Sequence, residues 1–209
     1  MTTAPAIQID RLKSQSMIIP IKGTMPLIVH NFSHKSKTAM LEAQQGVKKV
    51  KEIRDPQAEY EASLYHTANG FGFPVTAFKA ATVGSARFYG KAVNMTQLRQ
   101  FLFMHGAMSD KDPQALVEIH GEPRMREDVV RLGGMPRSAD LRYRAEFPEW
   151  TAELHVEFVA SSIGMESVLS LIDAGGRYVG VGEWRPEKRG EYGTYCVDVD
   201  REIVFLEGA

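Results

Sequence analysis

The sequence predicts a domain of the α+β class, and three observations carry this prediction. Residues 149–159, EWTAELHVEFV, alternate between apolar and polar side chains, which is typical of a strand with one buried face. Residues 75–90 and 164–174 carry small or apolar side chains in a helical pattern. Residues 122–146 have two strand-like arms around Gly133, Gly134 and Pro136, which indicates a hairpin.

The composition fits one soluble globular domain over residues 1–209, with 44% hydrophobic and 24% charged residues. The formal net charge is −1, so a nucleic-acid role would need a local basic face. Cys196 is the one cysteine, which excludes an intrachain disulfide and fits a reducing compartment. The start, MTTAPAIQID, does not read as a signal peptide, and no apolar run approaches the roughly 18 residues of a membrane span. We therefore expect a cytoplasmic protein with no membrane partner.

The first quarter of the chain predicts strands followed by a basic helix. Residues 7–30 hold isoleucine-rich runs that indicate one or two strands. Residues 33–54 predict a helix that ends at Asp55-Pro56. The helix has more cationic than acidic side chains. The cations can either lie on a solvent-exposed face or contact a nucleic acid. These cations are Lys35, Lys37, Lys48, Lys49, Lys51 and Arg54, against Glu42 and Glu52.

The middle of the chain alternates between helices and strands. Residues 57–66 begin as a helix, and residues 75–90 form another, whose small side chains favour close packing against a sheet. Residues 94–105 predict a short helix and then a strand at Phe101–Met104. Residues 109–113 predict a polar turn, and residues 116–120 alternate like a strand.

Near the end of the chain, residues 175–195, GGRYVGVGEWRPEKRGEYGTY, interleave six glycines with cations and aromatic side chains. The helix over 164–174 is expected to stop at Gly175-Gly176, and strands are expected over 194–199 and 202–206. Glycines let a backbone approach a partner closely, cations neutralise phosphate, and aromatic rings stack on bases. A nucleic-acid contact and a mobile surface hairpin both fit this composition.

No catalytic, metal or cofactor motif is present. His30 and His34 are four residues apart, but no acidic or cysteine partner completes a zinc pattern. The GxSxG, phosphate-loop and kinase signatures are absent from the sequence. We therefore expect no metal site and no cofactor.

Four segments follow one another in an order that carries a family resemblance. They are KGTMPLIVHN at 22–31, FPVTAFKAATVGSARF at 73–88, the hairpin and strand at 125–158, and VGVGEWRPEKRGEYGTYCV at 179–197. In this order they resemble the RAMP superfamily, in particular the backbone subunits of CRISPR effector complexes. The corresponding family features are a turn after "PL", the segment "IPGSSLKGALR", a "thumb" hairpin before an "E-x-x-P-x-x-x-F" strand, and the glycine-rich loop "GGxxSRGxGxV".

The resemblance implies an RRM-like, ferredoxin-like α+β domain with an inserted, thumb-like β-hairpin at 122–146. It implies sequence-tolerant binding of a single-stranded nucleic acid, RNA or DNA, by protomers that line up along the strand as a helical or filamentous homo-oligomer. The hairpin of one protomer would reach its neighbour. Trp184 or Tyr192 would stack on a base. The candidate nucleic-acid-binding residues are Lys22, Lys79, Arg87, Arg124, Arg126, Arg131, Arg137, Trp184, Arg185, Lys188 and Arg189, and the hairpin also carries Arg142 and Arg144.

The resemblance does not imply strand cleavage. Cleaving members of the family have an aspartate in the loop after the first strand, where this chain reads HNFS at 30–33. We therefore expect no enzymatic activity and no catalytic residue. Two alternatives stay open. One is a phage-type structural or assembly protein that oligomerises without nucleic acid, and the other is a RAMP-type endoribonuclease that uses His30, His34 or His66.

Overall fold

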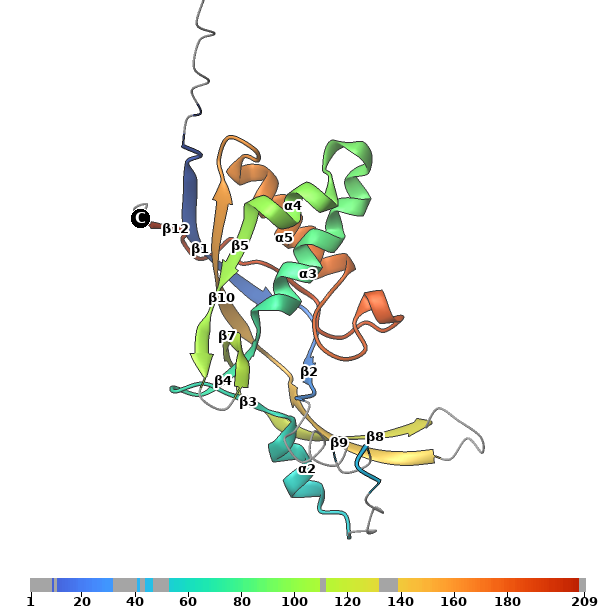
Figure 1. Ribbon diagram of the computed structural model, residues 1–209. Helices are drawn as coiled ribbons and strands as arrows, with labels where there is room; N and C mark the ends of the chain where they lie inside the picture. Colours follow the sequence, from blue (N-terminus) through green and yellow to red (C-terminus); the bar gives the residue numbers. More distant parts are fainter. Residues whose placement is uncertain are drawn as a thin grey trace, which may run out of the picture.

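The computed structural model has a mixed α+β fold with antiparallel sheets, as the sequence predicts at this level. The structure describes residues 11–31, 53–109, 112–131 and 139–206, together with Ile9, Leu41 and residues 44–46. Within these ranges it has four α-helices and two sheets (Figure 1). Most of the predicted helix over 33–54 lies outside the described residues.

The larger sheet is built around β1 and β10. These two strands pair antiparallel from Ser14 opposite Val159 to Lys22 opposite Thr151. β11 and β12 pair with the other edge of β1, while β5 and β7 pair with the other edge of β10. The strands of this sheet are β1 (Ser14–Gly23), β3 (Tyr65–His66), β4 (Phe71–Pro74), β5 (Leu102–His105), β6 (Ala107–Ser109), β7 (Asp112–His120), β10 (Thr151–Val159), β11 (Tyr195–Val197) and β12 (Val204–Leu206).

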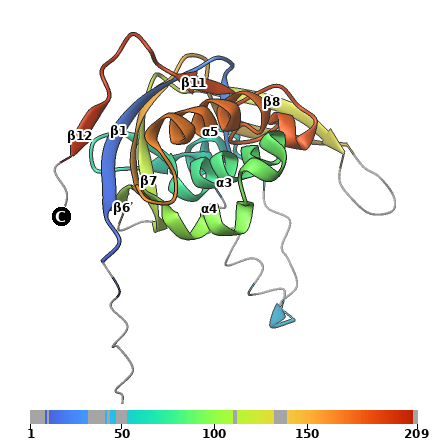
Figure 2. The same cartoon turned by 90° about the horizontal axis from the view of Figure 1, so that it is seen from above.

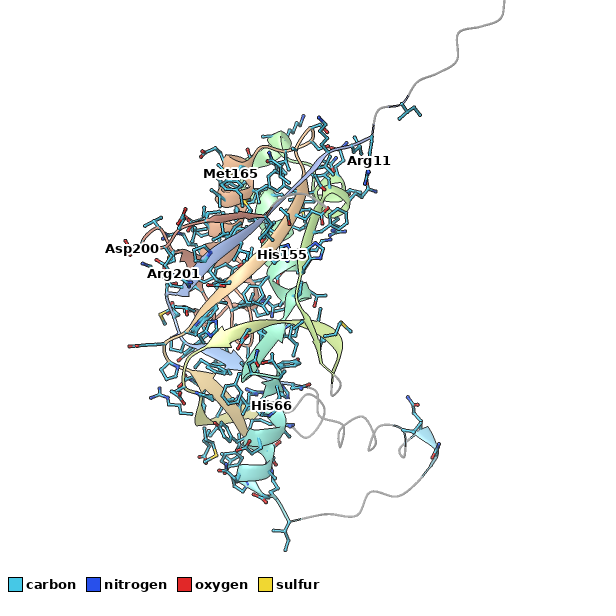
Figure 3. The ribbon with its side chains drawn as sticks, turned by 90° about the vertical axis from the view of Figure 1, so that its left-hand side faces the viewer. Arg11, His66, His155, Met165, Asp200 and Arg201 are labelled. Carbon is cyan, nitrogen blue, oxygen red and sulfur yellow. The ribbon has the colours of Figure 1, made fainter. Side chains whose placement is uncertain are left out.

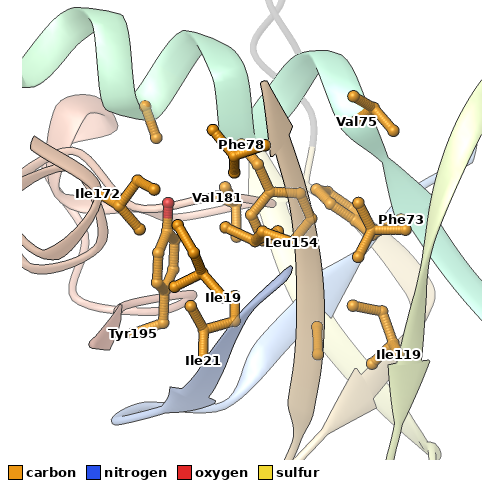
Figure 4. Close-up of a cluster of buried hydrophobic side chains, with 14 of the residues drawn as sticks. Ile19, Ile21, Phe73, Val75, Phe78, Ile119, Leu154, Ile172, Val181 and Tyr195 are labelled. Carbon is orange, nitrogen blue, oxygen red and sulfur yellow. The ribbon is translucent and has the colours of Figure 1, made fainter. Parts of the chain in front are cut away.

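Helices α3 (Val75–Ser85), α4 (Met95–Phe101) and α5 (Met165–Tyr178) lie together on one side of this sheet (Figure 2). The alternation in β10 explains the packing, because Ala152, Leu154 and Val156 are buried while residues between them are partly or fully exposed. Side chains from β1, β10, α3, α5 and β11 meet in one hydrophobic core (Figure 4). The opposite face carries polar side chains such as His155 (Figure 3).

Helix α5 corrects one prediction, because it runs through Gly175-Gly176 and ends at Tyr178. The two glycines serve packing here. A Cβ on Gly175 would lie 2.9 Å from the carbonyl oxygen of Ala81 in α3, and one on Gly176 would lie 2.2 Å from the carbonyl oxygen of Tyr195. The missing side chains therefore let α5 approach both α3 and β11.

The predicted hairpin is present and forms the second sheet. β8 (Arg124–Arg131) pairs antiparallel with β9 (Ala139–Phe147), and β9 pairs with the short strand β2 (Leu27–Val29). Helix α2 (Pro56–Ser63) packs against β9. The hairpin extends away from the larger sheet, on the side of the molecule where the loop after α5 lies (Figures 1 and 2).

Other boundaries differ from the prediction by a few residues. The helix predicted over 75–90 ends at Ser85 and continues as a 3₁₀ segment, η1 (Ala86–Ala92), while β5 starts at Leu102. The polar turn predicted at 109–113 is shorter, because β6 ends at Ser109 and β7 begins at Asp112. In the part of the chain that the structure describes, no helix has the length and apolar character needed to cross a membrane.

Candidate functional site

The segment between α5 and β11, residues 179–194, is called the glycine loop here. Its backbone is tied to the rest of the domain at several points. Glu183 N donates to Ile28 O at 3.0 Å, Gly193 N donates to Pro26 O at 2.8 Å, and Val181 N donates to Gly193 O at 2.9 Å. The loop is therefore attached to β2 and folds back on itself, unlike the loose surface hairpin that its composition also allowed.

Two glycines are needed for this close approach. Gly182 has φ +76°, and a Cβ there would lie 2.6 Å from the carbonyl oxygen of Ile28. Gly193 has φ +64°, and a Cβ there would overlap the carbonyl oxygen of Val181. Both positions combine left-handed backbone with contact to another carbonyl group, so only glycine fits.

Two other loop residues adopt positive φ without being glycine. Trp184 has φ 56° and Arg189 has φ 65°, a conformation that costs about 1–2 kcal/mol for a residue with a side chain. Trp184 keeps 46% of its surface exposed, and Arg189 and its neighbour Lys188 are also exposed. Backbone strain of this kind often accompanies a functional role, and here it presents an indole and cations to solvent.

The glycine loop also gathers cations around Glu187. Arg185 forms an ion pair with Glu187 at 2.8 Å and donates to Gly182 O at 3.0 Å. Arg87, which follows α3, lies 3.6 Å from the same carboxylate. The hydrogen bond from Arg185 holds the pKa of Glu187 below its ordinary value. Arg87 and Arg185, both predicted from the sequence, are thus brought together.

The base of the hairpin lies against the glycine loop. The Arg126 guanidinium is 4.7 Å from the centre of the Tyr192 ring, close enough for a cation–π contact. Arg126 and Arg124 both bond the buried carboxylate of Glu146, each at 2.7 Å. Burial raises the pKa of Glu146, but these hydrogen bonds outweigh burial and the pKa lies below its ordinary value.

Arg144 is the most buried arginine of this cluster, with 8% of its surface exposed. Its Nε and Nη1 atoms are buried and make no hydrogen bond to the described residues. Asp128 lies 3.6 Å from Nη1 and supplies an opposite charge. The positive charge of Arg144 also lowers the pKa of Glu183, although less than the hydrogen bond from His30 and less than the opposing effect of burial.

A pocket of about 240 Å³ lies where the glycine loop meets α3 and the end of β2. His30 Nδ1 lies 3.3 Å from Glu183 Oε1 at this site, and this hydrogen bond lowers the pKa of Glu183. The pocket is lined by His30, Tyr65, Phe73, Ala77, Ala80, Ala81, Val179, Gly180, Val181, Gly182, Glu183, Arg185 and Glu187. Sequence reasoning missed Glu183 and the aromatic wall, because no motif links residues so far apart in the chain.

Other predicted site residues lie elsewhere. Lys22 forms ion pairs with Asp198 and Asp200 at 3.1 and 3.0 Å. Lys79 bonds the Arg99 carbonyl oxygen at 3.2 Å and lies 5.2 Å from the centre of the Phe103 ring, so it faces α4 and β5. Arg131 ends β8, remote from the base of the hairpin, and Arg137 lies outside the described residues. Within the described ranges, no three His, Cys, Asp or Glu side chains are placed to hold a metal ion.

Comparisons with known proteins were made by sequence and by structure. No family model matches the chain, and no curated protein matches it. One similar solved structure is Cmr6 from Pyrococcus furiosus, with 10% identity, 90% of this chain and 100% of that chain covered, and a TM-score of 0.43. Another is a chain of the Type III-B Cmr-beta complex bound to cognate target RNA, with 10% identity, 94% of this chain and 62% of that chain covered, and a TM-score of 0.47.

The present chain spans less than two thirds of the matched Cmr-beta chain. Identity of 10% and TM-scores below 0.5 are too low to transfer a function.

Proposed function

We propose that this protein binds a single-stranded nucleic acid, RNA or DNA, along the glycine loop and the base of the hairpin. The observation that carries the proposal is the cation–π contact between Arg126 and Tyr192, which joins these two elements. Around this junction Trp184, Lys188 and Arg189 are exposed. Such a surface offers cations to phosphates and an aromatic ring to bases, and these are the two interactions that sequence-tolerant strand binding uses.

We infer that the larger sheet contains an RRM-like, ferredoxin-like unit. Its elements follow in the chain as β1, α3, β5, β10, α5 and β11, and the strands lie in the order β11-β1-β10-β5. Each neighbouring pair in this order is antiparallel. The hairpin of β8 and β9 then counts as the insertion, since it precedes β10 and leaves the sheet.

The proposal predicts binding that weakens steeply with salt. Each phosphate contact to a single strand adds about 0.7 to the slope of log affinity against log salt. Fluorescence anisotropy with single-stranded RNA, single-stranded DNA and duplex, over a salt series, measures this slope. The double variant Lys188→Ala/Arg189→Ala should reduce the slope by about 1.4, while Trp184→Ala should weaken binding at every salt concentration.

A matched control is Lys13→Ala, which removes an exposed cation just before β1. Its slope should equal that of the unaltered protein. Binding that does not depend on salt, or no measurable binding at low salt, contradicts the proposal. Copurification of nucleic acid, seen as absorbance at 260 nm, separates it from the alternative of a phage-type assembly protein, which would oligomerise without nucleic acid.

We further propose that protomers line up along the strand and that the hairpin reaches the next protomer. Val129 and Leu141 support this, because they are paired across the hairpin and expose 69% and 38% of their surfaces. Exposed apolar pairs on a projecting element favour contact with another protein surface. Negative-stain microscopy of complexes with long strands tests whether filaments or helical assemblies form.

One observation favours the alternative of RNA cleavage. His30 and Glu183 form a histidine–carboxylate pair beside the pocket, an arrangement that can hold an imidazole for general acid–base catalysis. Under the main proposal the protein binds without cleaving. Incubation with labelled single-stranded RNA decides between them, because cleavage that is lost in His30→Ala would establish the nuclease.

A further inference from the structure

The pocket beneath the glycine loop has an apolar lining that suits a planar ring. Ala77, Ala80 and Ala81 of α3 form one wall, and Phe73 and Val181 also line it. The alanines recur at helical spacing, so they present a shallow apolar surface with no bulky side chain. The volume of about 240 Å³ is below the roughly 300–1,000 Å³ of pockets for drug-sized ligands, which favours a single ring system.

The polar edge of the pocket accepts hydrogen bonds. Glu183 is fixed by its backbone bond to Ile28 O, and its Oε1 accepts from His30. A carboxylate has about four lone-pair sites, so one bond leaves Oε2 and part of Oε1 able to accept from a ligand. Arg185 is already engaged by Glu187 and Gly182 O. The edge therefore fits a ring that carries adjacent N–H donors.

The charges outside the pocket have the opposite sign. Lys188 and Arg189 are exposed in the same loop, and Arg87 lies beside Glu187 at the pocket edge. A ligand that satisfies both regions has N–H donors on a ring and negative charge outside it. A nucleotide has this polarity, with a base that enters the pocket and a phosphate that stays at the surface.

We propose that the pocket holds a guanine base of the bound strand, with the Glu183 carboxylate accepting from guanine N1–H and N2–H. Guanine is the base whose ring edge offers two adjacent donors to one carboxylate. This inference rests on the proposed function and adds a preferred base at one position of an otherwise sequence-tolerant strand. The base would have to leave its stack to enter the pocket, as flipped bases do in other nucleic-acid proteins.

The test uses oligouridine strands that carry one central guanosine, adenosine, inosine or abasic site. The guanosine strand should bind about 10-fold more tightly than the adenosine or abasic strand, with inosine between them because it keeps N1–H and lacks the amino group. Glu183→Gln should remove the preference, measured as the ratio of the affinities for the guanosine and adenosine strands. Glu153→Gln, an exposed glutamate on β10, is the matched control and should keep the preference.

A second variant protects the test against misfolding of the first. Ala77→Leu fills the pocket from α3 without changing a charge, and it should also remove the preference for guanosine. Strand binding that is equal for all four oligonucleotides overturns the guanine pocket and leaves the proposed function standing. Guanosine monophosphate, added as a competitor, distinguishes the source of the base. If the protein binds this nucleotide tightly and binds no strand, the base in the pocket does not come from a strand. That result overturns both this inference and the proposed function.

Discussion

Gly176 shows how one residue fixes the position of the glycine loop. It lies inside α5, where glycine is unfavourable, and a Cβ there would meet the backbone and ring of Tyr195. Tyr195 is fully buried and begins β11, directly after the loop. The close contact between α5 and β11 therefore holds both ends of the glycine loop.

Gly176→Ala should destabilise the protein by about 1–3 kcal/mol, because the methyl group overpacks a core that cannot expand freely. Urea unfolding followed by circular dichroism measures the change. Gly70→Ala is the control, since no atom lies within 4 Å of the position of its Cβ. Equal stability of the two variants would show that α5 and β11 are not packed as closely as described.

His155 is the residue from which we expect a dependence of stability on pH. It lies on β10 opposite His105 on β5, with 4.7 Å between the ring centres, and its Nε2 is 2.9 Å from Ser16 Oγ. Burial lowers the pKa of His155 below its ordinary value, and His105 lowers it further, while Glu157 opposes the shift. The unfolded chain therefore takes up a proton on this residue at a higher pH than the folded protein does.

Stability should consequently fall as the pH decreases from about 7 to 5, because the unfolded state binds more protons in this range. His155→Gln should show a shallower loss of stability over the same range in urea unfolding. His120→Gln, an exposed histidine at the end of β7, controls for loss of an imidazole as such. Parallel stability curves for the unaltered protein and His155→Gln would contradict this account.

At the scale of elements, Glu146 is a buried carboxylate at the base of the hairpin. Glu146 on β9 exposes 3% of its surface and accepts from Arg124 and Arg126 on β8. A buried ion pair contributes little net stability, but removal of one partner leaves the other charge uncompensated. Arg126 also bonds Asp128 at 3.0 Å, so Glu146 and Asp128 together hold it in place against Tyr192.

Glu146→Gln should destabilise the protein by about 2 kcal/mol or more, measured by urea unfolding. It should also weaken strand binding, since Arg126 loses one of the two carboxylates that position it. The control is Glu153→Gln, whose partner Arg201 is exposed like Glu153 itself, and the cost there should stay below about 1 kcal/mol. A loss of stability no larger than that of the control would count against this role of Glu146.

Local patterns in the sequence predicted the elements whose side chains alternate regularly. β10 follows from period-two alternation, and the hairpin follows from the Gly-Gly and Pro between its two strand-like arms. The end of α5 was predicted wrongly, because Gly175-Gly176 has the composition of a helix stop and only the packing of α3 and β11 explains its place inside the helix. The sequence also did not predict the register of β6 against β7, because this register depends on the residues that pair across a short turn.

The site was predictable only in part for the same reason. Arg87, Arg185 and the hairpin arginines were named from their residue type, and the structure brings several of them together. The pairing of His30 with Glu183 joins segments that lie far apart in the chain. Such a pair follows from the topology of β2, β9 and the glycine loop, which no local pattern encodes.

At the scale of the whole molecule, the hairpin leaves the larger sheet and carries its exposed apolar residues away from the core (Figure 1). Val129 exposes 69% of its surface and is paired with the exposed Leu141, so the two form a small apolar patch on the hairpin. If protomers line up along a strand, this residue lies on the element that contacts the neighbour. Its substitution should then separate binding by one protomer from assembly by many.

The Val129→Asp variant should bind a strand that is too short for two protomers about as tightly as the unaltered protein does, within about twofold. The reason is that the altered residue lies away from the glycine loop. On long strands it should lose cooperative assembly, since a charge placed in an apolar contact must be desolvated. Anisotropy on short strands and negative-stain microscopy on long strands measure the two effects. Val199→Asp alters a valine of similar exposure next to β11 and should assemble normally. Filaments formed equally by both variants would show that the hairpin does not make the contact between protomers.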